Sequence, residues 1–159
     1  NVAARMNLAE LYIEHGYLQA GAVQCERVLQ IVPNHPDALL HLAIVKANRG
    51  ELAEAEALNR KIVAINKYNF IARYNLAVVL LKQGRLEEAR ENVEFALLKS
   101  TNKDGAKLGA ASTLKNQIDQ LIVQRKEEER RQKALASQNK EKDTQDKSEE
   151  ESKDLVYEE

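Results

Sequence analysis

Apolar and small residues recur along the chain at a fixed step of 34 positions, so that Leu8, Leu42 and Leu76 fall in register. Three stretches share one skeleton: "NLAELYIEHGYLQAG" from residue 7, "HLAIVKANRGELAEA" from residue 41 and "NLAVVLLKQGRLEEA" from residue 75. A period of about 34 residues with this content is typical of a helix–turn–helix unit that stacks on copies of itself. The pattern therefore predicts a row of helix pairs.

Each recurring residue has a structural reason. In the first helix of a unit, a Leu and Ala pair such as Leu76 and Ala77 faces the partner helix, and the small Ala allows the two axes to approach closely. A glycine follows the last turn because it adopts the left-handed conformation that ends a helix, and these glycines are Gly16, Gly50 and Gly84. Ala55 and Ala89 mark a second close approach, where the first unit carries Gly21 at a propensity cost of about 1 kcal/mol.

This pattern resembles the tetratricopeptide repeat family over residues 2–103. The resemblance divides this region into three consecutive units, residues 2–35, 36–69 and 70–103. It implies an all-α, right-handed superhelical solenoid. The chain departs from the family pattern at the bulky aromatic early in the first helix, which is replaced by Arg5, Leu39 and Arg73. The proline between units is kept only as Pro33, so the departures weaken individual loops and leave the frame intact.

Residues 104–136 continue with a helical pattern that lacks the glycine stop. We expect this segment to form a long helix that caps the exposed apolar face of the last unit, because Leu114, Ile118, Leu121 and Ile122 keep helical spacing. Residues 137–159 are almost wholly polar and charged, and we expect them to be disordered when free. The alternative is a tether whose final "LVYEE" docks on a partner.

Composition supports helices and narrows the classes of partner. The chain of 159 residues is 43% hydrophobic but only 4% aromatic, and its 6 Gly and 2 Pro leave few turns. The net charge of −1 provides no overall positive field, which argues against nucleic acid as a partner. We expect no transmembrane segment, because no run of about 18 apolar residues occurs. The chain begins with Asn rather than Met, so we expect a fragment or processed form. Its localisation is unknown: the cytoplasm is the default, and a removed signal or anchor segment is left open.

The sequence favours a protein that is not an enzyme. The candidates for chemistry are His15, His35, His41 and the single cysteine, Cys25. None of them has the spacing of a metal site, and no glycine-rich phosphate loop or nucleophile elbow is present. We therefore expect no catalytic residue, no cofactor and no metal, and interpret Cys25 as a core residue.

The family resemblance implies a concave groove, lined by the first helices, that holds a peptide or a helix from a partner protein. Carried over position by position, the predicted groove residues are Met6, Asn7, Glu10, Leu40, His41, Ile44, Asn48, Ile71, Tyr74, Asn75, Val78 and Lys82. Asn7, His41 and Asn75 occupy equivalent positions, from which an Asn amide can both donate to and accept from a ligand backbone. Tyr74 is the predicted anchor, since a large aromatic with a polar tip suits the centre of an interface.

The resemblance argues against one subtype and leaves other functions open. Chaperone-binding members of the family clamp a C-terminal carboxylate pair with cations, whereas the matching positions here carry Met6, Glu10, His41, Ile71 and Asn75. We therefore expect an adaptor or scaffold that binds largely by apolar burial. One alternative is self-assembly into a homo-oligomer through the apolar strip and the open ends. Another is a regulatory or targeting domain of a larger protein, and the C-terminal helix itself is a further candidate to cover the groove.

Overall fold

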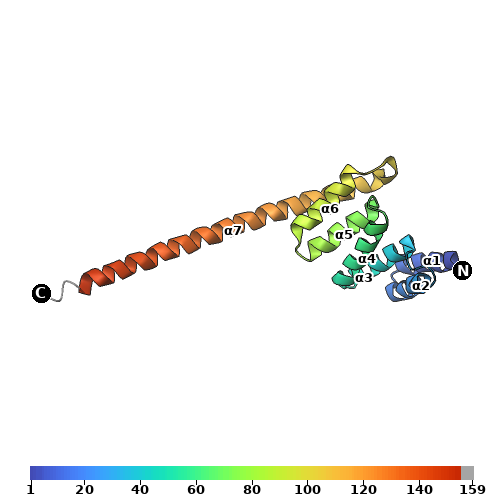
Figure 1. Cartoon of the computed structure of the whole chain (residues 1–159), viewed down its shortest axis with the longest axis horizontal. Helices are drawn as coiled ribbons and strands as arrows, with labels where there is room; N and C mark the ends of the chain where they lie inside the picture. The colour runs from blue at the N-terminus through green and yellow to red at the C-terminus, as the bar shows by residue number, and fades with distance from the viewer. Residues whose placement is uncertain (155–159) are drawn as a thin grey trace. The chain divides into compact units, whose positions relative to one another are not determined.

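The computed structural model describes residues 1–154, with side chains described to residue 149, and contains no strand within that range. Its helices are α1 (Val2–Glu14), α2 (Leu18–Ile31), α3 (Pro36–Asn48), α4 (Leu52–Ile65), α5 (Phe70–Lys82), α6 (Leu86–Leu98) and α7 (Gly105–Asp154), with a short 3₁₀ turn, η1, at Asn102–Asp104. Each predicted repeat contains one helix pair. The all-α solenoid expected from the sequence is confirmed, and Figure 1 shows its pairs following one another from α1 and α2 to α5 and α6.

The helix ends follow the local chemistry of the sequence. Gly16, Gly50 and Gly84 have φ angles of 81°, 78° and 77°, so each ends a first helix in the left-handed conformation as predicted. All three first helices begin at polar caps: the Asn69 side chain accepts a hydrogen bond from the backbone N–H of Ala72, the His35 ring does the same for α3, and the Asn1 side chain does so for α1. The repeated step in sequence therefore becomes a repeated turn in space.

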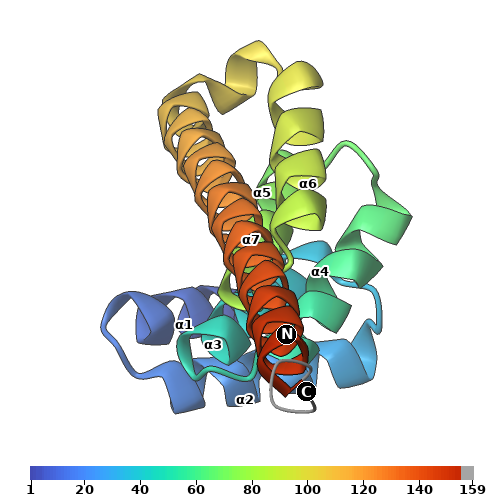
Figure 2. The same cartoon turned by 90° about the vertical axis from the view of Figure 1, so that its left-hand side faces the viewer.

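The small residues of the repeat lie where helices pack most closely. Ala9, Ala43, Ala77, Ala55 and Ala89 are all at most 1% exposed, which confirms their predicted place between helices. Neighbouring first helices also contact one another, α1 with α3 and α3 with α5. Figure 2 shows α3 and α5 on the inner side of the array and α4 and α6 further out. The first helices thus line the inner, concave side.

Gly21 holds its position for a steric reason that the sequence alone did not reveal. A Cβ atom at Gly21 would lie 2.5 Å from Cγ1 of Ile13 and 3.2 Å from the Ala9 carbonyl oxygen. Ile13 stands at the position that Ala47 occupies in the second unit. The larger side chain on α1 is therefore accommodated by the smallest residue on α2.

The chain divides into two compact parts, residues 1–119 and a second part that begins at Gln120. In the part formed by residues 1–119, Ala111, Leu114 and Ile118 on the opening turns of α7 are buried. The Lys115 Nζ atom of α7 also lies 3.5 Å from the Glu94 Oε1 atom of α6, so these turns pack beside the last repeat as a cap.

The sequence predicted disorder from residue 137, whereas α7 continues to Asp154 in the structure. Lys, Glu and Gln are good helix formers, and pairs four residues apart support the helix, as in the 3.1 Å hydrogen bond from Gln132 to Glu128. The final "LVYEE", proposed from sequence as a docking element, lies outside the described residues.

Candidate functional site

Two clefts meet on the inner side of the solenoid. The first, here called the α3–α5 cleft, has a volume of about 200 Å³ and is lined mainly by residues of α3 and α5. The second, the α5–α7 cleft, has a volume of about 280 Å³ and lies between α5 and the first turns of α7. Tyr74 and Asn75 line both clefts, so the two clefts adjoin at these residues.

Seven of the predicted groove residues line these clefts. Those in the α3–α5 cleft are Ile44, Asn48, Tyr74, Asn75, Val78 and Lys82. Ile71 joins Tyr74 and Asn75 in the α5–α7 cleft. The clefts therefore gather the part of the prediction that falls on α5 and on the second half of α3.

The other five predicted residues line neither cleft. Met6 packs against the core of the first unit and Leu40 against the core of the second, so both are partly used for folding. Asn7 and Glu10 are exposed on α1, while His41 is half-buried on α3. Their contact with a ligand stays a prediction.

The structure adds cleft residues that sequence reasoning missed. Phe70 and, from α7, Ala106, Lys107 and Ala110 line the α5–α7 cleft. Asn59 of α4 lines the α3–α5 cleft although it belongs to a second helix and is 1% exposed. The step of 34 offered one signal: Asn59 falls in register with apolar side chains in the other two units.

Two amide groups at the clefts lack hydrogen-bond partners within the described part of the chain. The Asn75 Nδ2 and Asn59 Oδ1 atoms are both shielded from solvent, and neither is paired. The Asn59 Nδ2 atom, in contrast, donates to the Ala55 carbonyl oxygen at 2.9 Å. A buried polar atom without a partner costs about 1–3 kcal/mol, which makes these two atoms candidates for contact with a ligand.

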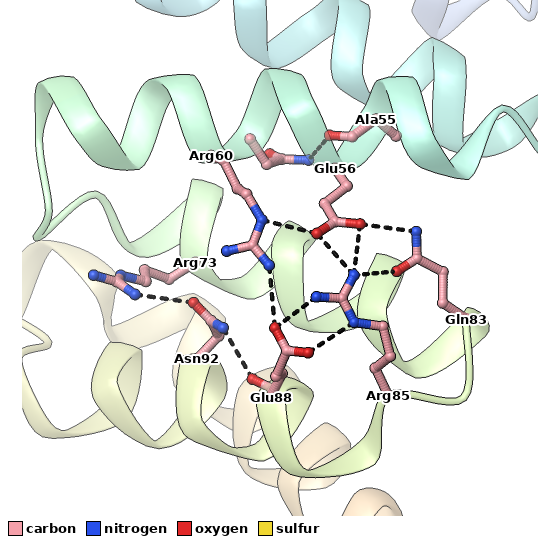
Figure 3. Close-up of polar contacts among 9 residues, drawn as sticks. Ala55, Glu56, Arg60, Arg73, Gln83, Arg85, Glu88 and Asn92 are labelled. Atoms are coloured by element: carbon pink, nitrogen blue, oxygen red, sulfur yellow. Dashed lines mark hydrogen bonds and ion pairs between the residues drawn. The ribbon is translucent and has the colours of Figure 1, made fainter.

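A polar network away from the clefts ties α4 to α6 (Figure 3). Glu56 accepts hydrogen bonds from Arg60 at 2.8 Å, from Gln83 at 3.0 Å and from Arg85 at 2.8 Å. Arg60 and Arg85 both pair with Glu88 as well. Burial alone would raise the pKa of Glu56, but the donated hydrogen bonds outweigh it and lower that pKa to about 2. The network fixes the second and third units against each other and so positions α3 beside α5.

Polar pairs replace the aromatic that the family pattern places early in the first helix. Arg5 donates to Gln24 at 3.2 Å in the first unit, and Arg73 donates to Asn92 at 2.9 Å in the third. The guanidinium of Arg73 also lies 4.3 Å from the ring centre of Phe95. At the same two positions the second unit carries two leucines, which pack in one apolar cluster. The same contact between the two helices of a unit is thus polar in the first and third units and apolar in the second.

Three of the four candidates for chemistry, His15, His35 and Cys25, have structural contacts or are buried. His35 caps α3, and the His15 ring lies 2.8 Å from the Leu11 carbonyl oxygen. Burial, with a smaller contribution from Glu26, raises the pKa of Cys25 to about 11. Across the described residues, no group of three or more His, Cys, Asp or Glu side chains is placed to hold a metal ion. None of the described helices is long and apolar enough to cross a membrane.

Comparison with known proteins identifies the repeat. Two models of the tetratricopeptide repeat family match the chain, one over residues 37–67 and the other over residues 58–91. Residues 37–91 of this chain are tetratricopeptide repeats. The mouse and human proteins called FK506-binding protein-like are each 35% identical to it over 83 residues, which are 52% of this chain and 24% of theirs. This tetratricopeptide repeat chain thus spans about a quarter of the length of the curated relatives that it matches.

Solved tetratricopeptide repeat structures share the fold at low identity. The first such domain of Spaghetti (RPAP3), bound to the HSP90 peptide SRMEEVD, is 18% identical with a TM-score of 0.69, covering 77% of this chain and 93% of that one. The Sgt2 domain of Aspergillus fumigatus is 12% identical with a TM-score of 0.70, covering 79% and 82%. The TPR2B domain of yeast Sti1, in complex with an Hsp70 peptide, is 15% identical with a TM-score of 0.67, covering 74% and 98%.

Proposed function

We propose that this tetratricopeptide repeat protein is a non-catalytic adaptor that holds a peptide segment of a partner protein on its inner side. One observation carries the proposal: two adjoining clefts share Tyr74 and Asn75, and the Asn75 Nδ2 atom has no partner within the described chain. The solved structures that contain bound HSP90 and Hsp70 peptides support a role in protein interaction. An extended segment crossing α5 would occupy both clefts at once.

Apolar burial supplies most of the binding energy in this proposal. Ile44, Val78 and Ile71 form apolar walls, and Tyr74 lies at the junction of the clefts. Each Å² of apolar surface removed from water contributes about 25 cal/mol, before the costs of association. The Asn75 amide then fixes the register of the segment by donating to a backbone carbonyl.

The proposed ligand is an internal segment rather than a C-terminal carboxylate pair. The positions that would clamp such a pair carry no cation, and the exposed carboxylate of Glu10 would repel it. The cations at the clefts are Lys82, in the last turn of α5, and Lys107, near the start of α7. They suit single acidic side chains that flank an apolar stretch.

Selection from a random peptide library, followed by fluorescence anisotropy with a selected peptide, tests the proposal. Replacing Tyr74 by Ala should weaken binding at least about 30-fold, the loss typical of a central aromatic anchor. Tyr17→Ala is the matched control, because Tyr17 is 65% exposed and lines neither cleft. Equal affinity of the two variants would show that the peptide binds elsewhere, and a library that yields no binder would argue against peptide binding altogether.

A further inference from the structure

Asn59 is an exception to the repeat in the interior of the protein. It is 1% exposed, and the step of 34 aligns it with Cys25 and Val93, which are both 0% exposed. Two units thus fill this position with an apolar or weakly polar side chain, while the second unit buries an amide. Burying an amide where a valine also fits costs free energy unless the amide is fully hydrogen-bonded.

The hydrogen bonds of Asn59 are only half satisfied. Its Nδ2 donates to the Ala55 carbonyl oxygen at 2.9 Å, which fixes the orientation of the amide, because the opposite orientation would set two oxygens against each other. Its Oδ1 is then left without a donor among the described residues. Asn75 presents the complementary case, a shielded Nδ2 donor without an acceptor. Both residues line the α3–α5 cleft, so an unused acceptor and an unused donor belong to residues of one cleft, and a ligand reaches the two shielded atoms when the side chains that cover them move.

These two groups define what the cleft should take. Its walls include the apolar side chains of Ala43, Ile44 and Val78, and its volume is about 200 Å³. The complementary occupant has an apolar stem and a tip that both donates and accepts. A primary carboxamide meets that description; a carboxylate cannot donate, an ammonium cannot accept, and an aliphatic group can do neither. We propose that the α3–α5 cleft selects a glutamine or asparagine side chain of the bound segment, an inference that rests on the proposed peptide-binding function.

In this arrangement the ligand carboxamide donates to Asn59 Oδ1 and accepts from one N–H of Asn75 Nδ2, while its methylene stem contacts the cleft walls. The second N–H of Asn75 Nδ2 remains for the backbone carbonyl of the segment. Selectivity arises because a carboxylate or methyl analogue leaves the Asn59 oxygen unpaired. Water is small enough to enter the same volume, so a hydrated cleft without selectivity is the competing outcome.

Peptide selection separates the inference from the function on which it rests. The same random library is selected against the wild type and against Asn59→Val, which introduces the residue that the third unit already carries at this position. We expect peptides from the wild type to share a Gln or Asn at one position and peptides from Asn59→Val to lack it. Peptides that depend on Tyr74 for binding but share no Gln or Asn at one position would overturn the selectivity and leave peptide binding intact. A failure to recover any binder would overturn both.

A measurement with small probes is independent of any peptide. Propionamide reproduces the glutamine tip, 2-butanone has the same shape without the donor, and propionate carries the charge. Titrated into the labelled protein and followed by NMR, propionamide should shift the side-chain amide signals of Asn59 and Asn75 with about tenfold higher affinity than 2-butanone, the effect of one buried hydrogen bond. Equal affinities, or no shift with any probe, would indicate a cleft occupied by water only and overturn the proposal.

Discussion

Glu56 offers a sharp test of the packing that places α3 beside α5. Replacing it by Gln keeps the shape of the side chain but removes the charge that Arg60, Gln83 and Arg85 surround (Figure 3). The two arginines retain Glu88, so the variant is expected to fold. Its free energy of unfolding should fall because a carboxylate with strong donors becomes a neutral amide.

The magnitude follows from the pKa of Glu56. Lowering that pKa from 4.5 to about 2 corresponds to an upper limit of about 3.5 kcal/mol, at about 1.4 kcal/mol per pKa unit. Solvent reduces this value, since the Glu56 side chain is 15% exposed and those of Arg60 and Arg85 are 46% and 40% exposed. We therefore expect the Glu56→Gln protein to lose about 1–2 kcal/mol at neutral pH.

The direction of the Glu56 pKa shift determines how its stabilising effect changes with pH. The folded-state pKa lies below the unfolded value, so the stabilisation is present above pH 4.5 and is lost as pH falls toward 2. Urea unfolding followed by circular dichroism at pH 7 and at about pH 3 should show the gap between wild type and Glu56→Gln narrowing in acid. Glu14→Gln, at an exposed position on α1, is the control and should change stability by less than about 0.5 kcal/mol. A gap that is absent at pH 7, or unchanged in acid, would refute the role given to the network.

Three further predictions concern the frame. Gly21→Ala should lower the free energy of unfolding in urea by about 1–2 kcal/mol, although Ala has the better helix propensity. In an Ile13→Ala background the same substitution should be neutral or stabilising. A gain in stability in the wild-type background would contradict the close contact. Asn92→Leu alone should cost about 1–3 kcal/mol by removing the acceptor of the Arg73 Nη1 group, whereas adding Arg73→Leu should recover most of that loss, because the second unit already carries two leucines there; strict additivity would refute this. Cys25 should react with a thiol reagent only as the protein unfolds, since a pKa of about 11 lowers its thiolate fraction about a hundredfold relative to a pKa of 9; rapid labelling of the native protein would contradict its burial.

The frame of this protein could be predicted from sequence because repeated positions carry repeated physical demands. The glycines that end the first helices needed a left-handed backbone, and the small residues between helices needed a close approach; both features are present. Seven of the twelve proposed groove residues line the two clefts for the same reason, since they share a face of α3 and α5.

The remaining features depend on where individual side chains point and how deeply they are buried, which the period of the sequence does not specify. Lys107 reaches the α5–α7 cleft because α7 begins after η1, where the side chains and backbones of Thr101 and Asp104 cap each other. The hydrogen-bond deficit of Asn59 depends on which neighbours approach a single oxygen atom. The reason for Gly21 lies in Ile13, a residue of another helix. Each of these depends on how neighbouring elements pack in space, which the period of the sequence does not give.

The central claim is that a partner segment lies across α5 at Tyr74. The most direct measurement replaces Tyr74 by the photo-crosslinking residue p-benzoylphenylalanine, with Tyr17 replaced in parallel as the exposed control, and irradiates each protein with a peptide selected from the random library. The peptide should cross-link at position 74 and not at position 17. Cross-linking at position 17 alone, or equally at both positions, would contradict it.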